Sequence, residues 1–263
     1  MQHNDKKVAL VTGSATGVGA ATCRLLASRN WDVVVNYSRS GTEAEETAAS
    51  CEALGSQVLV CQADVAEDTD CRNLVAQTME KFGRIDALVN NAGTTRYCSF
   101  DDLEGLSKED FMFLYGVNVV GAYQVTRAAV PHLRKAESPA IVNISSISAI
   151  SGVGSSIAYA ASKGALSTMT LSLAHALAPQ IRVNAVCPGF IQGRWTKDFL
   201  KDRYDAVEER VASASLLHKT SVPEDIARTI VFLIEEAGMT TGQILTVDGG
   251  NLLHQGKLKI PIL

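Results

Sequence analysis

The strongest constraint on the fold of this chain is the alternation of short β-forming runs with longer helical patterns. Seven runs are rich in valine, isoleucine and leucine, and they cover residues 7–12, 31–37, 57–62, 86–91, 140–145, 181–186 and 243–248. Strands that are separated by helices usually pair in parallel, because each helix carries the chain back along the sheet before the next strand begins. The sequence therefore predicts an α/β fold with a parallel, doubly wound sheet.

Chain length and hydrophobicity argue for one domain. The chain has 263 residues, of which 46% are hydrophobic, and this is enough to bury one sizeable core. No repeat or low-complexity linker interrupts the pattern, so we expect a single domain over residues 1–263. Two stretches fit no strand–helix unit, namely 190–220 and the tail 251–263. The first is long enough to form a lid over a substrate, and the tail could dock on a neighbouring subunit or fray.

Composition excludes several classes of function. The 24 Lys and Arg residues against 28 Asp and Glu residues give a net charge of −4 without a long basic block, so we expect no nucleic-acid partner. No apolar run reaches the roughly 18 residues that a membrane span needs, and the first residues lack the apolar core of a signal peptide. The six cysteines form no CxxC motif. We therefore expect a cytoplasmic protein with reduced thiols, no membrane segment and no metal site.

The first predicted strand runs directly into a glycine-rich loop, TGSATGVGAAT. The spacing of Gly13, Gly17 and Gly19 lets the backbone turn sharply and approach a pyrophosphate, which the N–H groups at the start of the next helix would bind. Taken alone, this spacing also fits an ordinary turn between a strand and a helix. The position after the first strand and before the first helix favours a dinucleotide site.

A tyrosine and a lysine lie four residues apart in the alanine-rich segment SIAYAASKGAL, residues 156–166. The segment has helical periodicity, so Tyr159 and Lys163 are expected on one face of a helix. The pair alone fits two interpretations equally well, a catalytic pair or a core-helix lysine beside an unrelated tyrosine. The remaining motifs have to decide between them.

Five motifs together resemble the short-chain dehydrogenase/reductase family. They are TGSATGVG at 12–19, NNAG at 90–93, Asn118, Ser146 and YAASK at 159–163, and they occur in the order and approximate spacing of that family. The resemblance runs from about residue 6 to residue 250 and is greatest toward the 3-oxoacyl-[acyl-carrier-protein] reductase and carbonyl reductase branch. It implies a single-domain Rossmann-type sheet of seven strands with helices on both faces, a nicotinamide cofactor, and an oxidoreductase reaction on a carbonyl or alcohol group.

The resemblance also implies catalytic roles for four residues. Tyr159 would donate a proton to the carbonyl oxygen, and Ser146 would hydrogen-bond that oxygen. The ammonium of Lys163 would hold the nicotinamide ribose. Together with the oxidised nicotinamide it would lower the pKa of Tyr159 from about 10 toward about 7, which needs roughly 4 kcal/mol. Asn118 would hold a water that links Lys163 to solvent. The simpler interpretations are a turn serine at Ser146 and a polar residue at a helix bend at Asn118.

Further residues match family positions that contact the cofactor. They lie in the glycine loop, after the second, third and fourth strands, and around the PG of VCPGF: Gly13, Ser14, Thr16, Gly17, Val18, Gly19, Ser38, Arg39, Ser40, Asp64, Val65, Asn91, Ala92, Gly93, Pro188, Gly189 and Ile191. Asp64 would meet the adenine ring, and a loop carboxylate that caps the next helix is its simpler interpretation. Ala92 and Gly93 would line the pocket through their backbone.

The residues around the end of the second strand favour NADP(H) over NAD(H). NAD-dependent enzymes commonly place an acidic residue at the end of this strand, where it binds the ribose hydroxyls and repels a 2′-phosphate. This chain has Asn36 there, followed by Ser38, Arg39 and Ser40, whose guanidinium and hydroxyls suit a phosphate. A solvated arginine in a turn is the alternative, since the glycine loop itself carries no basic residue.

The sequence leaves the substrate open. A small molecule or an acyl thioester would fit, and a soluble ketone, a quinone or a sugar competes equally with a 3-oxoacyl thioester, because the basic residues near one helix end also suit a solvated terminus. Loops 94–97, 151–156 and 190–220 are expected to select the substrate. In the last loop Gly193 replaces the threonine of the nearest relatives, which leaves open how the nicotinamide amide is bound.

Other classes of protein remain as alternatives to this enzyme. A non-catalytic dinucleotide-sensing scaffold would keep the fold and the cofactor, but it would have no reason to retain Tyr159 as a proton donor. A sugar-nucleotide epimerase or dehydratase shares the YxxxK motif, but it usually has a different glycine spacing and a longer substrate domain.

We also expect a homotetramer. The helices at about 108–135 and 156–178 carry more small and apolar residues than one buried face needs, among them Ala158, Ala161 and Leu173. Family members pair these two helices across two-fold axes. Burial of the same residues within the monomer is the alternative.

Overall fold

All seven predicted strands form one sheet in the computed structural model, which describes residues 6–253. They are β1 Val8–Val11, β2 Asp32–Tyr37, β3 Val58–Gln62, β4 Ala87–Asn90, β5 Ala140–Ile144, β6 Arg182–Pro188 and β7 Ile244–Val247. The strand order is β3-β2-β1-β4-β5-β6-β7, and every neighbouring pair is parallel. The predicted α/β class and the parallel seven-stranded sheet are confirmed.

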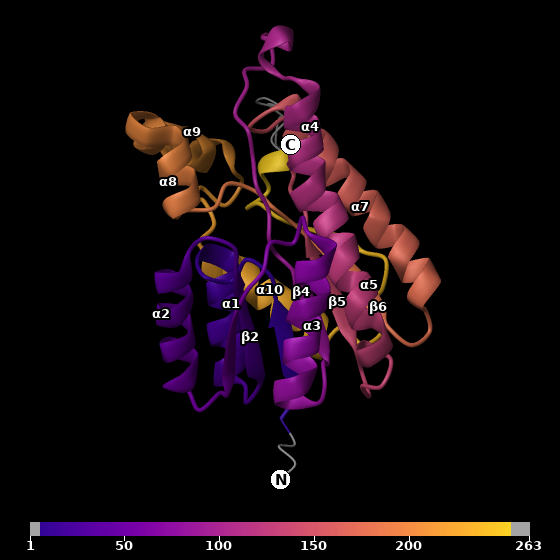
Figure 1. The fold of residues 1–263 in the computed structure, drawn as a ribbon. Coiled ribbons are helices and arrows are strands. Elements are labelled where there is room, and N and C mark those ends of the chain that lie inside the picture. Colours follow the sequence, from indigo (N-terminus) through magenta and orange to yellow (C-terminus); the bar gives the residue numbers. More distant parts are fainter. Residues whose placement is uncertain (1–5, 254–263) are drawn as a thin grey trace, which may run out of the picture.

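Helices cover both faces of the sheet (Figure 1). Their bounds are α1 Gly17–Ser28, α2 Gly41–Glu52, α3 Asp68–Phe82, α4 Lys108–Tyr115, α5 Ala122–Leu133, α6 Ser148–Ser151, α7 Ile157–Leu177, α8 Arg194–Leu200, α9 Tyr204–Ala214 and α10 Pro223–Glu235. Residues of α1, α2 and α10 form one hydrophobic core with the sheet, and residues of α3, α5 and α7 form another. The result is the predicted doubly wound arrangement of three layers.

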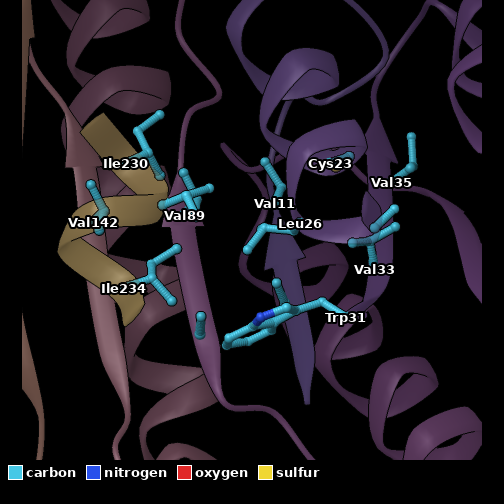
Figure 2. Packing of buried hydrophobic residues seen from close by; sticks show 14 of the residues in the cluster. Val11, Cys23, Leu26, Trp31, Val33, Val35, Val89, Val142, Ile230 and Ile234 are labelled. Atoms are coloured by element: carbon cyan, nitrogen blue, oxygen red, sulfur yellow. The ribbon is translucent and has the colours of Figure 1, made fainter. Parts of the chain in front are cut away.

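The two cores follow from the alternation of side chains along each strand. In β1, Ala9 and Val11 belong to one core, whereas Val8 and Leu10 belong to the other. Figure 2 shows the first of these cores, in which side chains of α1 and α10 meet the valines of the strands. The central strands are buried on both faces and therefore read as nearly continuous apolar runs. This is why the sequence predicted their positions to within a few residues.

The order of the strands reverses at β1. The chain winds outward from β1 through β2 to β3, and it then crosses to the other side of β1 to form β4. The helix α1 follows β1 onto one face, whereas α5, which comes after β4, packs on the opposite face. Doubly wound folds bind ligands at such a switch point, beyond the carboxyl ends of the strands. The carboxyl ends of β1 and β4 therefore mark the place to look for a site.

Residues 190–220, which we call the flap, form a helical insertion between β6 and α10. It contains α8, the 3₁₀ turn Lys201–Arg203 and α9. Its two ends are joined, because the Gln192 N–H donates to the Ser221 carbonyl at 2.8 Å and the Ser221 N–H donates to the Phe190 carbonyl at 3.2 Å. Figure 1 shows α8 and α9 standing beyond the ends of α1 and α2. The flap thus begins and ends at one short base.

Over residues 6–253, no helix combines the length and the hydropathy that crossing a membrane requires. All six cysteines are buried and form no disulfide. The tail predicted at 251–263 is described only as far as the 3₁₀ turn Asn251–Leu253. The expectation for its remaining residues lies outside the described part of the chain.

Candidate active site

The glycine loop between β1 and α1 leaves open space at the start of α1. Gly13 and Gly17 have φ angles of 60° and 58°, which side chains rarely adopt. A Cβ at Gly13 would lie 2.7 Å from the Cα of Ala92, whereas a Cβ at Gly17 would meet nothing within 4 Å. The Thr16 side chain does not cap α1. The N–H groups around Gly17 and Val18 therefore face a space that an anion could fill.

The segment after β4 is bound directly to the glycine loop. The Asn91 side chain donates to the carbonyl of Gly13 at 2.9 Å, and the Thr12 hydroxyl accepts from the N–H groups of Asn91 and Ala92 at 3.0 Å each. A Cβ at Gly19 would lie 2.6 Å from the Asn91 amide nitrogen. The two sequence motifs thus form one rigid unit at the switch point.

Asn36 has a structural role that the sequence did not predict. The residue is 1% exposed, its Oδ1 accepts from the Gly13 N–H at 3.0 Å, and its Nδ2 donates to the Ala63 carbonyl at 3.1 Å. The Asn36 amide therefore holds the glycine loop against the end of β3. Ser14 is also fully buried, and its hydroxyl accepts from the Asn36 N–H. The strand ends one residue later, at Tyr37.

The helix α7 places Tyr159 and Lys163 beside the end of β5. Ser156 caps this helix by accepting from the Tyr159 N–H at 3.1 Å. The Lys163 side chain is buried, and its Nζ donates to the carbonyl of Ile144 at 2.8 Å. The same Nζ lies 5.8 Å from the centroid of the Tyr159 ring. The predicted pairing of the two side chains on one helix face is therefore present.

Ser146 lies two residues beyond the end of β5 and hydrogen-bonds the Tyr159 side chain. Its hydroxyl also accepts from the Ser148 N–H at 3.1 Å and donates to the Ser148 hydroxyl at 3.1 Å. The residue is therefore both a turn serine and a partner of Tyr159. Ser148 itself was not predicted, and it orients the Ser146 hydroxyl.

Asn118 lies in a π-helical segment, Gly116–Gly121, that joins α4 to α5. Such segments are often found at functional sites. Its Oδ1 accepts from the Thr94 N–H at 2.8 Å, and its Nδ2 donates to the Thr94 carbonyl and the Ser162 hydroxyl at 3.0 Å each. A Cβ at Gly93 would lie 3.4 Å from both Asn118 Oδ1 and Lys163 Nζ. Gly93 therefore lets the NNAG segment sit over both polar groups.

Burial shifts the pKa values of the two central groups in opposite directions. It raises the pKa of Tyr159 to about 12, and the hydrogen bond between Tyr159 and Ser146 offsets only part of this increase. It lowers the pKa of Lys163 to about 8. The chain alone therefore does not produce the lowered tyrosine pKa that the sequence suggested, because that expectation included the charge of an oxidised nicotinamide. The Tyr159 hydroxyl keeps its proton at neutral pH.

The turn after β2 presents an unpaired cation. Within residues 6–253, the exposed guanidinium of Arg39 makes no hydrogen bond and no ion pair. Ser38 is exposed beside it, and Ser40 is the N-cap residue of α2 without a capping hydrogen bond from its side chain. These three residues lie together and are available to an anion.

Asp64 and Val65 follow β3. The exposed Asp64 carboxylate accepts from the Ala66 N–H at 3.0 Å, so it stabilises the turn that leads into α3. Val65 is 5% exposed, and a Cβ at Gly121 would lie 2.8 Å from its Cγ2. The Val65 side chain therefore belongs to the packing between β3 and the π-helical segment, and only its backbone can face a ligand.

Pro188 and Gly189 close the site at the end of β6. Pro188 pairs with Val247 in β7, and the Gly189 N–H donates to the Val247 carbonyl at 2.9 Å. A Cβ at Gly189 would lie 2.8 Å from the Cβ of Asp248. A glycine is needed here because the two chain segments approach so closely.

The base of the flap explains the glycine at position 193. Gly193 has a φ angle of 152°, at which a residue with a side chain would be strained. Ile191 forms a parallel bridge with Ser221, and the Thr196 hydroxyl donates to the carbonyls of Ile191 and Gly193 at 2.8 and 2.9 Å. A threonine hydroxyl is thus present three residues after Gly193, where the family resemblance led us to expect a threonine.

Sequence reasoning missed three further hydroxyl groups around the site. They belong to Thr12, Ser162 and Thr196, and each binds a residue that the motifs had singled out. Thr12 carries a weak signal, because it directly precedes the first glycine of the loop. Ser162 and Thr196 carry none, because only the folded backbone brings them to their partners.

Comparisons with known proteins agree with this geometry. Residues 13–251 match a family model described as enoyl-(acyl carrier protein) reductase. A ketoacyl reductase assigned to the granaticin polyketide synthase of Streptomyces violaceoruber is 42% identical over 243 residues, which cover 92% of this chain and 95% of that protein. An L-rhamnose 1-dehydrogenase (NAD(P)(+)) of a Sphingomonas species is 36% identical and covers 95% of this chain and 98% of its own length.

A solved structure is similar over the same range. A crystal structure from Burkholderia xenovorans, assigned as a short-chain dehydrogenase/reductase, superposes with a TM-score of 0.89 at 40% identity. The match covers 95% of this chain and 99% of the other. The similarity therefore extends over the sheet, the site and the flap.

Proposed function

This chain belongs to the short-chain dehydrogenase/reductase family, an oxidoreductase family that acts on carbonyl and alcohol groups, and on that premise we propose that it reduces a ketone with NADPH. The observation that carries the proposal is the meeting of Ser146, Tyr159 and Lys163 beyond the end of β5. Asn118 joins them from the π-helical segment, because Asn118 Oδ1 and Lys163 Nζ both lie next to Gly93. A structural cluster alone would not need a buried lysine beside a tyrosine ring.

Tyr159 is the proposed proton donor. A raised pKa of about 12 keeps its hydroxyl protonated at neutral pH, which is the form that reduction of a carbonyl requires. Ser146 would share the developing charge on the substrate oxygen through a second hydrogen bond. When bound, the nicotinamide supplies the hydride.

Lys163 and Asn118 are the proposed route for replacing that proton. Among residues 6–253 the Lys163 ammonium has one protein acceptor, the Ile144 carbonyl, and it keeps further N–H groups for a ribose hydroxyl or a water. From the described part of the chain, Asn118 Oδ1 accepts one hydrogen bond, from the Thr94 N–H, and retains a second lone pair. A water held there would connect Lys163 with solvent.

The residues around the glycine loop fit a dinucleotide. The open space at Gly17 and the uncapped start of α1 suit a pyrophosphate. Backbone groups of Asn91, Ala92 and Gly93, with Pro188, Gly189 and Ile191 opposite them, would surround the nicotinamide half. Asp64 and the backbone of Val65 would lie toward the adenine. These assignments extend the proposal and rest on the same geometry.

NADPH is proposed over NADH because of the turn after β2. Arg39 has no competing partner within residues 6–253, and Ser38 and Ser40 flank it with hydroxyls. A guanidinium with two neighbouring hydroxyls matches a 2′-phosphate. Neither Asn36 nor Tyr37, at the end of β2, offers the carboxylate that would favour NADH.

The substrate is proposed to be a ketone on an apolar body, either a 3-oxoacyl thioester or a free aromatic or aliphatic ketone. Side chains that are more than half exposed gather on the segments that follow β4, β5, β6 and β7: Tyr97, Leu103, Val153, Leu216, Leu217 and Leu253. Exposed apolar groups around a site are suited to an apolar ligand. A sugar would leave them in contact with water, which makes a sugar substrate the weaker alternative.

A panel of carbonyl compounds assayed by NADPH consumption tests this function. The panel should hold a 3-oxoacyl thioester, a bicyclic aromatic ketone, a quinone and an aldonolactone at equal concentration. We expect the highest kcat/KM with one of the two apolar ketones. Preference for the lactone would contradict the substrate class. Absence of turnover with every compound, combined with tight NADPH binding, would favour the dinucleotide sensor instead.

We further propose that the protein works in the cytoplasm as a homotetramer. Six buried cysteines without a disulfide fit a reducing compartment. Met112, Tyr123 and Leu171 on α4, α5 and α7 are 63%, 46% and 40% exposed, which leaves apolar surface for a second copy. Ala158 is fully buried inside the subunit and therefore does not belong to this surface.

A further inference from the structure

An ion pair joins the flap to the nucleotide-binding half of the domain. The guanidinium of Arg194, the first residue of α8, donates to the carboxylate of Glu43 in the first turn of α2. The two residues are 151 positions apart in the sequence. In Figure 1, α8 lies above the upper end of α2, in agreement with this contact.

The Glu43 end of this pair lies next to the glycine loop. Glu43 lines a cavity of about 280 Å³ together with Thr16 and Gly17 of the loop and Arg24 of α1. The Arg194 guanidinium also holds the pKa of the Glu43 carboxyl below its ordinary range, so the carboxylate is charged at neutral pH. The contact therefore stands at the edge of the space that we assign to the pyrophosphate and the adenosine.

The Arg194 end is held firmly in place by the base of the flap. The Thr196 hydroxyl binds the carbonyls of Ile191 and Gly193, and the Lys197 N–H donates to the Gly193 carbonyl at 3.0 Å. These bonds set the direction in which α8 starts. From this fixed start of the flap, the Arg194 side chain reaches α2 at Glu43.

We propose that Arg194 and Glu43 form a clasp that closes the flap over the bound dinucleotide, so that the cofactor leaves only after this ion pair opens. The inference rests on the proposed function, since it requires a dinucleotide on the glycine loop. Both residues are positioning residues and need not touch the reacting atoms. On the substrate side, the Arg203 guanidinium lies 5.8 Å from the centroid of the Tyr97 ring. The flap therefore has separate contacts for the cofactor and for the substrate loop.

The solvent exposure of the Arg194–Glu43 ion pair limits how much it can slow the release of the cofactor. The two side chains are 50% and 32% exposed, and ion pairs of this kind change an equilibrium by about fivefold at most. The clasp therefore tunes how fast the cofactor leaves and does not decide whether it binds. Added salt should weaken it, because exposed charges are screened.

The test is a double-mutant cycle on the rate of NADPH release. The variants Arg194→Gln, Glu43→Gln and the combination of both are loaded with NADPH, and dissociation is followed by the fluorescence of the reduced nicotinamide without substrate. We expect each single change to speed release by about threefold to fivefold, and the double variant to release no faster than the single variants. Thermal stability should stay unchanged in all three.

A matched control and the contrary outcomes complete the test. Arg210→Gln removes the same charge from α9, an exposed position of the flap without an ion pair among the described residues, and should leave the release rate unchanged. The clasp would be overturned if the double variant released NADPH faster than the wild type by the product of the two single-variant factors. It would also be overturned if neither single variant changed the release rate. Both results would leave the proposed function intact. A wild-type protein that binds neither NADPH nor NADH would overturn both.

Discussion

Lys163 Nζ lies 2.8 Å from the carbonyl oxygen of Ile144, the last residue of β5, and donates a hydrogen bond to it. This contact holds a buried amine between the sheet and Tyr159. Because burial lowers the pKa of Lys163 to about 8, the amine loses its charge within the range of ordinary assays. The charge state of this one group should therefore be visible in both activity and stability.

The first prediction concerns the pH dependence of activity. We expect kcat/KM for ketone reduction to fall as the pH rises through about 8, because Lys163 then becomes neutral and no longer supplies its ammonium. Initial rates across this range measure the effect. The Lys163→Arg variant stays charged over this pH range, so whatever activity it retains should not fall as the pH rises through about 8. The same fall of kcat/KM in the arginine variant would show that a group other than Lys163 titrates.

The second prediction concerns the pH dependence of folding. A lysine pKa near 8 in the folded state and about 10.4 in the unfolded state means that the unfolded chain binds more protons between these values. Lys163 therefore makes the free energy of unfolding rise with pH over that interval. Urea titrations of the wild type and of Lys163→Met isolate this contribution as a difference. A difference that is constant with pH would show that the lysine titrates normally.

The third prediction separates two glycines of the same loop. Gly13→Ala should lower the free energy of unfolding by about 2 kcal/mol or more, since the new methyl group meets the backbone of Ala92 at a positive φ. Gly17→Ala should cost only about 1 kcal/mol, because its Cβ meets nothing within 4 Å, yet it should weaken NADPH binding by intruding on the phosphate space. Chemical denaturation and fluorescence titration measure the two effects. Equal losses of stability would contradict the distinction.

The fourth prediction tests the choice of cofactor. Arg39→Ala should raise the KM for NADPH by about tenfold or more, which corresponds to roughly 1.4 kcal/mol of lost binding, while NADH kinetics stay nearly the same. Steady-state kinetics with both cofactors measure this. Stability should not change, since Arg39 is exposed and has no partner within residues 6–253. A wild-type enzyme that prefers NADH would contradict the assignment.

The fifth prediction concerns assembly. Light scattering at micromolar concentration should return a particle of four chains, each of 28.0 kDa. Leu171→Arg, on the exposed face of α7, should shift the protein toward smaller species, because a charge would be buried in the proposed contact. Leu54→Arg changes an equally apolar, 49% exposed residue just beyond α2 and serves as the control. A wild-type particle of one chain would reject the tetramer.

Much of the fold was predictable from the sequence because the central strands are buried on both faces. Their apolar runs and the motif at each carboxyl end reveal which strands form the switch point. The spacing within one helix predicted that Tyr159 and Lys163 share a face, whereas Ser146 was grouped with them only through the resemblance of the motifs to one family.

The features of the site that the sequence did not predict depend on contacts between residues far apart in the sequence. The sequence showed only that Asn36 is not an acidic residue, and it did not predict that the Asn36 amide binds Gly13 and Ala63. The tyrosine pKa depends on burial, which no local pattern reports. The partnership of Glu43 with Arg194 crosses 151 residues, and only the folded flap creates it.

The measurement that tests the central claim most directly is turnover by Tyr159→Phe, with NADPH binding measured on the same preparation. The substitution removes one hydroxyl from a helix that Ser156 and Lys163 continue to anchor. We expect the dissociation constant for NADPH to stay close to that of the wild type, while kcat for ketone reduction falls about 10²- to 10⁴-fold. Retention of full turnover by this variant would contradict the role of Tyr159 as proton donor and, with it, the proposed mechanism.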